Sequence, residues 1–320
     1  MRALRLKPQL LKICIIGSGV VGQATGKALI YKGFNVSFID VNKEKVETLR
    51  KDGFHAYLPE DLVNGNFDFD ISFITVSTPT IGKKLEYSYL KKAAQFLGEK
   101  IQLLNKYHLV VIKSTVPPGT TRNMLKPIIE KASGKLAGRD FGLCMNPEYL
   151  REVSSLEDTI NAWFIVVGSF DERSRRILES VYNGFDCPKE FTTLEEAEAE
   201  KYVHNLFNAV KITYFNEMRQ VLRTLGVDAE RVFPLVVKSC EGLWNPKYGT
   251  KNMGPFSGMC LPKDTQAFLS YAMEKNIKMP LLDMTIKVND TIPPVTLAVP
   301  KVIPHPRNGH RPHAYVRHVH

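Results

Sequence analysis

The 320-residue sequence predicts an α/β protein in which a doubly wound parallel sheet is followed by an all-α domain with a long spine helix. Three observations predict this arrangement. From Lys12 onward, short β-branched apolar runs alternate with helical stretches, a pattern that builds a parallel sheet with helices on both faces. A Gly-rich segment directly follows the first run. After Thr192 the strand-like runs stop, and about 30 residues continue with helical character.

The expected strands are short and bounded by turn residues, as buried strands of a parallel sheet usually are. A Gly-rich turn follows the first strand and opens a helix that runs to Lys32. The strands are KICIIG (12–17), NVSFID (35–40), DISFITVS (70–77), HLVVIKS (108–114), FGLCMN (141–146) and FIVVG (164–168).

The long helix has a start signal and a stop signal. Thr193 and Glu196 have the spacing of a capping box, and Gly226 is a natural end. A helix of about 30 residues exceeds the usual length, which suits a spine that joins two domains or pairs two subunits. Asp228 should cap the next helix, which Pro234 should kink, and residues 265–290 are expected to be helical as well.

Composition and charge narrow the function classes. The net charge of +10 comes from Lys and Arg spread along the whole chain, whereas a nucleic-acid-binding protein would cluster them. The charge therefore indicates either a solvated basic surface or a small anionic substrate such as a phosphate ester. No apolar run could span a bilayer, and no secretion signal is recognisable. Because the five cysteines form no CxxC pair, we expect a reduced, cytoplasmic protein without a metal site.

A dinucleotide-binding fingerprint lies between the first strand and the first helix. Gly17 permits the tight turn, Gly19 lets the backbone approach a pyrophosphate at the helix N-terminus, and Gly22 lets helix and strand pack closely. Val20 and Val21 complete this segment and are expected to contact the cofactor. The strand before and the helix after the motif favour a Rossmann-type domain over a bare turn.

An acidic residue in the second βα unit indicates which dinucleotide binds. Asp40 ends the second strand 18 residues after Gly22, where a carboxylate accepts hydrogen bonds from the adenosine ribose and repels a 2′-phosphate. The sequence therefore predicts NAD rather than NADP, although Lys43 and Lys45 nearby weaken the preference. Lys45 is included among the expected cofactor contacts.

Hydroxyl residues follow the third and fourth strands. Thr78-Pro79 and Ser114-Thr115 lie at carboxyl ends of strands, the edge where ligands of open α/β sheets bind. An isolated threonine at such a position would be read as part of a turn, but the neighbouring fingerprint favours cofactor contacts for Thr78, Pro79 and Thr115.

Six ordered motifs together resemble one family. They are GSGVVG (17–22), VSTPT (76–80), KSTVPPGTT (113–121), NPEYLRE (146–152), EAEKYVHNLFNAVKITYFNE (198–217) and CLPKD (260–264). Over roughly residues 12–290 the chain is similar to the UDP-glucose/GDP-mannose dehydrogenases. That resemblance implies NAD-dependent oxidation of the C6 alcohol of a nucleotide sugar to a carboxylate, a role in polysaccharide biosynthesis and a homodimer formed through the long helix.

The resemblance also implies roles for individual residues. Cys260 would be the nucleophile, and Lys201 and Asn205, one helical turn apart, would both donate to the oxygen on the reacting carbon. Attack by the thiolate on the aldehyde gives a thiohemiacetal, whose oxidation gives a thioester for hydrolysis. The further catalytic residues would be Asp264, Thr115 and Glu148; further cofactor contacts Glu152 and Lys263; and substrate contacts Glu148, Tyr149, Leu150, Lys201, Asn205, Phe256 and Gly258.

Two departures from the family pattern bear on activity. Ser257-Gly258 replaces the usual Gly-Gly before x-Cys, so a Cβ at residue 257 is expected to restrict a positive φ or to crowd the sugar. After residue 290 the family continues into a third domain that binds the nucleotide, whereas this chain continues as a basic, Pro- and His-rich segment. We therefore expect a truncated enzyme, in which loss of most nucleotide contacts could weaken or abolish sugar oxidation.

These expectations divide the chain into an N-terminal extension (1–11), an NAD-binding domain (12–192), a helical central and dimerisation domain (193–290) and a disordered tail (291–320). The tail histidines at 310 and 313 or at 318 and 320 would bind metal only adventitiously. Two other interpretations stay open. A β-hydroxyacid dehydrogenase would need a lysine but no nucleophilic cysteine. A truncated NAD-binding or dimerisation module would have no activity.

Overall fold

The computed structural model describes residues 11–62, 66–250 and 254–294. The chain divides into two compact units, Met1–Asn208 and Ala209–His320, and each is described by itself below. The expected disorder of the tail, its histidines and most of the N-terminal extension lie outside the described residues. The domain limits at residues 192 and 290 stay predictions.

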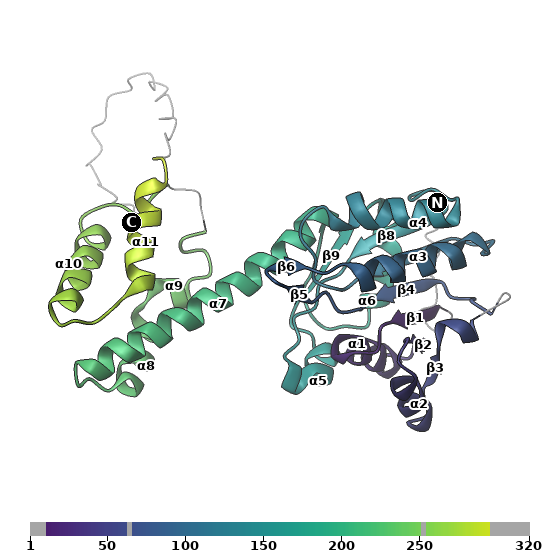
Figure 1. Ribbon diagram of the computed structural model, residues 1–320, viewed down its shortest axis with the longest axis horizontal. Coiled ribbons are helices and arrows are strands. Elements are labelled where there is room, and N and C mark those ends of the chain that lie inside the picture. Colours follow the sequence, from purple (N-terminus) through teal and green to yellow (C-terminus); the bar gives the residue numbers. More distant parts are fainter. Residues whose placement is uncertain (1–10, 63–65, 251–253, 295–320) are drawn as a thin grey trace, which may run out of the picture. The chain divides into compact units, whose positions relative to one another are not determined.

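The first unit contains an eight-stranded sheet in the order β10-β9-β8-β7-β4-β1-β2-β3 (Figure 1). The order reverses at β1, because β2 and β3 lie on one side of it and β4, β7 and β8 on the other. Such a reversal opens a crevice at the carboxyl ends of the strands. The strands are β1 (Lys12–Ile16), β2 (Asn35–Ile39), β3 (His55–Tyr57), β4 (Ile71–Ile74), β7 (His108–Ile112), β8 (Phe141–Met145), β9 (Ile165–Ser169) and β10 (Lys189–Thr193), beside a separate antiparallel pair, β5 (Thr80–Ile81) and β6 (Lys84–Leu85).

The predicted fold class is confirmed, but the sheet is not parallel throughout. Strand β9 pairs antiparallel with β8, with Cys144 opposite Ser169, and β10 runs parallel to β9. Sequence reasoning also missed β3, which has only three residues, and β10, whose sequence KEFTT lacks an apolar run. Short or polar edge strands carry little periodic signal, because one of their sides stays open to solvent.

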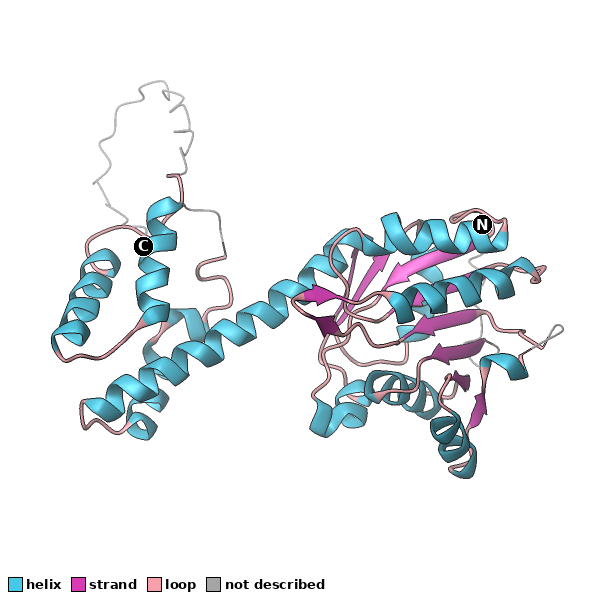
Figure 2. Ribbon diagram, in the orientation of Figure 1, coloured by secondary structure: helices cyan, strands magenta, loops and turns pink. Residues whose placement is uncertain are grey.

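Helices cover both faces of the sheet (Figure 2). Ile13 and Ile15 pack with α1, α2 and α6, whereas Cys14 and Ile16 face the side of α3, α4 and the start of α7. Burial on both faces explains why β1 is apolar at successive positions rather than alternating. The helices are α1 (Val20–Tyr31), α2 (Lys43–Lys51), α3 (Ser88–Gln102), α4 (Lys126–Ser133), α5 (Ser155–Ile160) and α6 (Glu172–Tyr182), with short turns η2 (Pro59–Asp61), η3 (Thr121–Leu125) and η4 (Glu152–Ser154).

The long helix α7 (Leu194–Thr224) begins and ends as predicted. The Thr193 Oγ1 accepts from the Glu196 N–H at 3.3 Å, and the Thr193 N–H donates to the Glu196 carboxylate at 2.9 Å, which completes the capping box. Gly226 has a φ of 71°, a left-handed conformation that ends the helix without Cβ strain.

Among the described residues of the second unit, four helices follow α7. Asp228 caps α8 by accepting from the Glu230 N–H at 2.9 Å, and Pro234 lies inside that helix. The expected helix over 265–290 is two helices separated by a turn in which Asn276 has a φ of 56°. A small core packs α10 and the turn after it against α7, and Leu282 of α11 lies against this core. Its buried residues are Val221, Ala272, Ile277 and Met279. The helices are α8 (Ala229–Ser239), α9 (Glu241–Trp244), α10 (Leu261–Glu274) and α11 (Pro280–Thr291).

The described residues lack two features. None of their helices is both long and apolar enough to cross a lipid bilayer. Within the same residues, no cluster of three or more His, Cys, Asp or Glu side chains is arranged to hold a metal ion.

Candidate cofactor and active site

The Gly-rich turn between β1 and α1 requires glycine at two positions. Gly17 has a φ of +97°, and a Cβ there would lie 3.0 Å from the Val76 backbone nitrogen. A Cβ at Gly22 would lie 1.9 Å from the Gly17 carbonyl oxygen, closer than any real contact. The tight turn and the close approach of helix to strand both depend on the missing side chains.

Gly19 serves a different purpose, because a Cβ at this position would meet no atom within 4 Å. It lies at the N-terminus of α1, where no side chain caps the helix and no acidic residue occupies the first turn. The first N–H groups of a helix have no partner within it and attract anions. The open space beside Gly19 and the uncapped helix therefore fit the pyrophosphate of a dinucleotide.

Asp40 lies at the end of β2, beside this turn. It is buried, and its carboxylate accepts from the Ser18 N–H at 2.5 Å and from the Asn42 N–H at 2.9 Å. Each carboxylate oxygen can accept a second hydrogen bond, so both retain capacity for ribose hydroxyls. Lys45, in contrast, lies exposed in the first turn of α2, and its backbone N–H donates to Asn42.

An open cleft of about 980 Å³ lies where the sheet order reverses. It brings together residues that follow β1, β4, β7 and β8, and the Thr78 hydroxyl donates to the Thr115 carbonyl at 3.0 Å. Six of the predicted cofactor contacts line this cleft, namely Gly19, Val20, Val21, Thr78, Thr115 and Glu152, whereas Gly17, Gly22, Asp40, Lys45, Pro79 and Lys263 do not. Its lining is Gly19, Val20, Val21, Thr75, Val76, Ser77, Thr78, Lys113, Ser114, Thr115, Glu148, Leu150 and Glu152.

A buried ion pair lies at one side of the cleft. Lys201, on α7, is only 4% exposed, and its ammonium lies 3.0 Å from the Glu148 carboxylate and 2.5 Å from the Glu148 carbonyl oxygen. The same ammonium lies 5.3 Å from the centre of the Tyr149 ring. Lys201 and Glu148, two of the residues expected to act in the site, thus lie together, and their pair joins a proton donor to a potential base.

Two neighbours hold this segment in shape. The Leu150 N–H donates to the Glu148 carboxylate at 3.0 Å, so both Glu148 oxygens have a partner. The Tyr149 hydroxyl donates to Glu200, and burial raises the pKa of Tyr149, which therefore stays a neutral donor. Asn205 follows Lys201 by one turn of α7 and is exposed.

The second unit carries the predicted nucleophile. Cys260 is exposed and directly precedes α10, at a helix N-terminus where negative charge is stabilised. Lys263 and Asp264 are also exposed and form an ion pair with each other. The loop before the cysteine is anchored on α11, because the Phe256 N–H donates to the Asn289 side chain at 2.7 Å and the Phe256 carbonyl accepts from the Asn289 amide at 3.2 Å.

The expected backbone restriction at Ser257 does not arise. Among the described non-glycine residues only Lys83 and Asn276 have a positive φ, so Ser257 adopts an ordinary conformation. The positive φ angles of this loop, 77° and 85°, belong to Gly254 and Gly258, and a Cβ at Gly258 would meet no atom within 4 Å. Glycine is therefore needed at residue 258 and not at residue 257.

Comparison with known proteins decides the family. The model of the UDP-glucose/GDP-mannose dehydrogenase family, NAD binding domain, matches residues 11–63 and 58–186, and the model of the central domain matches residues 195–291. The chain belongs to the UDP-glucose/GDP-mannose dehydrogenase family. Its first part is therefore an NAD-binding domain, in agreement with the glycine turn, the uncapped helix and Asp40.

Relatives and solved structures agree with this assignment. GDP-mannose 6-dehydrogenase of Pseudomonas putida is 32% identical over 302 residues, which cover 88% of this chain and 68% of the relative. UDP-glucose 6-dehydrogenase of Bacillus subtilis is 33% identical, over 87% of this chain and 63% of the relative. The structure of a ternary complex of GDP-mannose dehydrogenase from Pseudomonas aeruginosa has a TM-score of 0.82 at 31% identity, covering 87% of this chain and 68% of that one.

Two buried residues of this dehydrogenase domain escaped sequence reasoning. Lys113 is 6% exposed and lines the cleft, and Glu198 is fully buried on α7. Burial lowers the pKa of Lys113 to about 8, an effect that Glu148 opposes and Lys201 reinforces. A signal was present for Lys113, because it follows the run LVVI directly and begins the KSTVPPGTT motif, and a solvated lysine is unexpected at the end of such a buried strand.

Proposed function

We propose that this family member oxidises the C6 alcohol of a nucleotide sugar to the carboxylate in two NAD-dependent steps. The observation that carries the proposal is the buried Lys201–Glu148 pair beside the cleft of the NAD-binding domain. In this proposal the pair supplies a hydrogen-bond donor and a carboxylate to the alcohol that loses its proton. Bound NAD supplies the hydride acceptor for both oxidations.

The residues of this chain would act in sequence on one carbon. Lys201 and Asn205 donate to the C6 oxygen and stabilise the negative charge that develops there as the alcohol proton and the hydride leave. The Cys260 thiolate then forms a C–S bond to the aldehyde carbon, and the carbonyl oxygen takes a proton. Loss of a second hydride and that proton leaves a thioester.

Hydrolysis completes the cycle. Asp264 or Glu148 accepts a proton from a water that attacks the thioester carbon, and the C–S bond breaks to release the carboxylate and the free thiol. Thr115 would support this water, and Glu152 and Lys263 would contact NAD. We propose that Tyr149, Leu150, Phe256 and Gly258 contact the sugar nucleotide.

The sugar nucleotide itself is a finer proposal. We propose UDP-glucose or a close relative, and GDP-mannose is the main alternative because relatives of both kinds match the chain. The test titrates UDP-glucose, UDP-N-acetyl sugars and GDP-mannose with NAD and follows the absorbance of the reduced cofactor. Two reduced cofactors per sugar are expected.

The cysteine separates this function from its rivals. Cys260→Ser should stop the overall reaction after the first oxidation, because the alkoxide of serine neither captures the aldehyde nor leaves as readily. An activity indifferent to Cys260→Ala would favour a β-hydroxyacid dehydrogenase. NAD binding without a response to any nucleotide sugar would favour a binding module.

We also propose a homodimer formed through α7. An apolar stripe follows one side of this helix, with spacings of three and four residues, and such a stripe is unusual on a monomer surface. Two copies related by a two-fold axis would cover each other's stripe. Its residues are Val203, Leu206, Phe207, Val210 and Tyr214, with exposed fractions of 67, 61, 59, 55 and 47%.

The stripe also provides the test of the dimer. Phe207→Glu should convert the dimer to a monomer in analytical ultracentrifugation, because a charge replaces the apolar contact. Asn216→Glu is the control, because residue 216 is exposed and lies on the side of α7 opposite Phe207. We place the enzyme in the cytoplasm, where the nucleophilic thiol stays reduced.

A further inference from the structure

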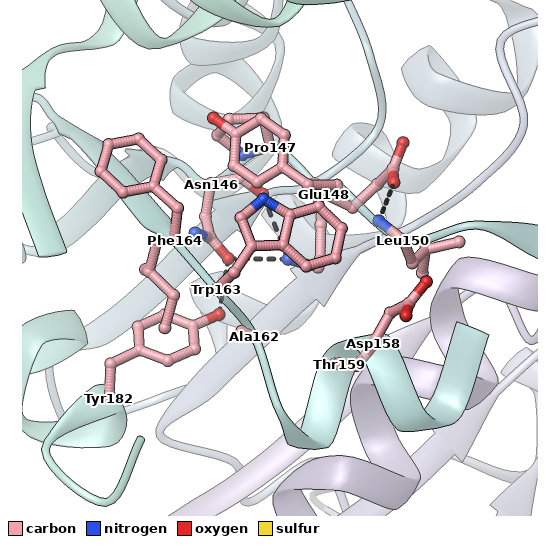
Figure 3. A pocket seen from close by; sticks show the side chains of 13 residues that line it. Asn146, Pro147, Glu148, Leu150, Asp158, Thr159, Ala162, Trp163, Phe164 and Tyr182 are labelled. Atoms are coloured by element: carbon pink, nitrogen blue, oxygen red, sulfur yellow. Dashed lines mark hydrogen bonds between the residues drawn. The ribbon is translucent and has the colours of Figure 1, made fainter. Parts of the chain in front are cut away.

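Lys113 is a buried cation at a position where a structural residue would be apolar. It follows β7 at the carboxyl edge of the sheet and lines two cavities. One is the open cleft, and the other is a smaller pocket walled by Tyr149, Trp163 and Phe164 (Figure 3). Burying a lysine that is only 6% exposed costs the fold free energy unless its charge is paired. Buried ionisable groups of this kind gather at functional sites.

Neutral groups hold the Lys113 ammonium. It donates to the Asn146 side-chain oxygen at 2.9 Å, and the Asn146 carbonyl lies at 3.4 Å. That side-chain oxygen also accepts from the Tyr182 hydroxyl at 2.5 Å (Figure 3), and the Asn146 amide donates to the Val166 carbonyl at 2.8 Å. Within the described residues no carboxylate lies within ion-pair distance of Lys113.

The charge of Lys113 is not neutralised by a direct ion pair. Glu148, two residues after Asn146, is paired with Lys201 and lies beyond ion-pair distance of Lys113, although its charge opposes the lowering of the Lys113 pKa. The other titratable groups that line the two cavities are Glu152, Tyr149, Tyr182 and Asp158, and Asp158 is bound by Arg151 at 2.7 Å. An ammonium without a paired carboxylate stabilises an oxygen anion that forms nearby.

We propose that Lys113 is a positioning residue of the oxidation: through Asn146 it holds the turn that presents Glu148 to Lys201, and its charge favours the alkoxide that forms on the substrate. This inference rests on the proposed function. It requires that Lys113 be protonated during turnover. The pKa of about 8 that burial gives this ammonium therefore sets an alkaline limit to activity.

The experiment compares the pH dependence of kcat and KM for the wild type, Lys113→Met and Tyr182→Phe. The methionine keeps the volume and removes the charge, so kcat at pH 7 should fall about 10- to 100-fold while the KM for NAD stays within about twofold. The wild type should lose activity above pH 8, and Lys113→Met should lack that limb. Tyr182→Phe loosens Asn146 but keeps the charge, so its alkaline limb should remain. Melting temperature and NAD binding confirm that each variant folds.

Other outcomes would overturn the inference. Equal kcat and equal pH profiles would show that Lys113 plays no part in the reaction. A kcat lowered by one factor at every pH would show a structural role only. If the wild type reduces no NAD with any nucleotide sugar, the proposed function fails instead. The protonation of Lys113 is then measured as its extent of acetylation by acetic anhydride at each pH, read by mass spectrometry. Half-labelling near pH 8 supports the inference, and a labelling profile equal to that of exposed Lys43 contradicts it.

Discussion

At the scale of single residues, surroundings change what an ordinary side chain does. An isolated helix lysine is normally solvated, but Lys201 is buried because the turn after β8 comes within 3.0 Å of it and supplies Glu148 as counter-ion. Two glycines of the turn between β1 and α1 likewise differ. Gly22 leaves no room for a methyl group, whereas Gly19 faces open space.

This difference predicts opposite effects of two alanine substitutions. Gly22→Ala should destabilise the fold by about 1–3 kcal/mol, because its Cβ collides with the Gly17 carbonyl. Gly19→Ala should unfold like the wild type but bind NAD more weakly, because its methyl group occupies the cleft. Urea denaturation and calorimetric titration with NAD measure the two effects. Gly184→Ala, whose Cβ would meet no atom within 4 Å, is the control and should change neither.

At the scale of elements, the start of α7 is joined to the loop after β7. The Glu198 carboxylate accepts from the Gly119 N–H at 2.5 Å and from the Thr121 N–H at 2.8 Å, two groups that begin the helical segment η3. Thr115 lies a few residues earlier on that loop. The tether therefore positions part of the cofactor cleft from a distant helix.

Removing one acceptor should weaken the tether. Glu198→Gln leaves one backbone N–H facing an amide group, and we expect a loss of about 1–3 kcal/mol in the free energy of unfolding. Glu195→Gln is the matched control, since Glu195 lies on the same turn of α7 and pairs with Arg122 while 36% exposed. It should cost less than about 1 kcal/mol. Equal losses in the two variants would contradict a special role for Glu198.

A second element-scale feature is a hydrogen-bonded chain across three strands. His108 is fully buried; its Nδ1–H donates to the Phe69 carbonyl at 3.0 Å, and its Nε2 lies 2.8 Å from Ser72. Ser72 in turn contacts the Cys14 thiol at 3.0 Å. Burial lowers the pKa of His108 to about 4, and the ring is therefore neutral near pH 7.

The lowered pKa predicts acid sensitivity of the first unit. The unfolded chain binds a proton at His108 near pH 6.5, while the folded ring resists it down to about pH 4. The linked stability is present above pH 6.5 and declines by about 3 kcal/mol as the pH falls to 4. His108→Gln should remove this part of the pH dependence, as measured by urea denaturation at each pH. A variant with the same slope as the wild type would refute the assignment.

At the scale of the whole molecule, the proposed reaction draws on residues of both compact units, with Lys201 in one and Cys260 in the other. Hydrogen exchange can follow each unit separately. NAD alone should protect peptides that contain residues 17–22, 75–78 and 113–115, because these line the cleft. The peptide with residues 254–260, which excludes the proposed NAD contact Lys263, should gain protection only when nucleotide sugar is added. Protection of that peptide by NAD alone would contradict the assignment of Cys260 to the sugar.

What the sequence by itself determined was local and contiguous: the alternation of strands and helices, the glycine turn with Asp40, the capping box at Thr193 and Glu196, and the ordered motifs of the family. Each of these depends on residues a few positions apart, so its physical cause can be read along the chain. Only the tertiary structure decided the reversal of β9, the burial of Lys113, the Lys201–Glu148 pair and the Glu198 tether. These features join segments more than 20 residues apart or depend on burial, and burial is a property of packing that spacing along the chain does not encode.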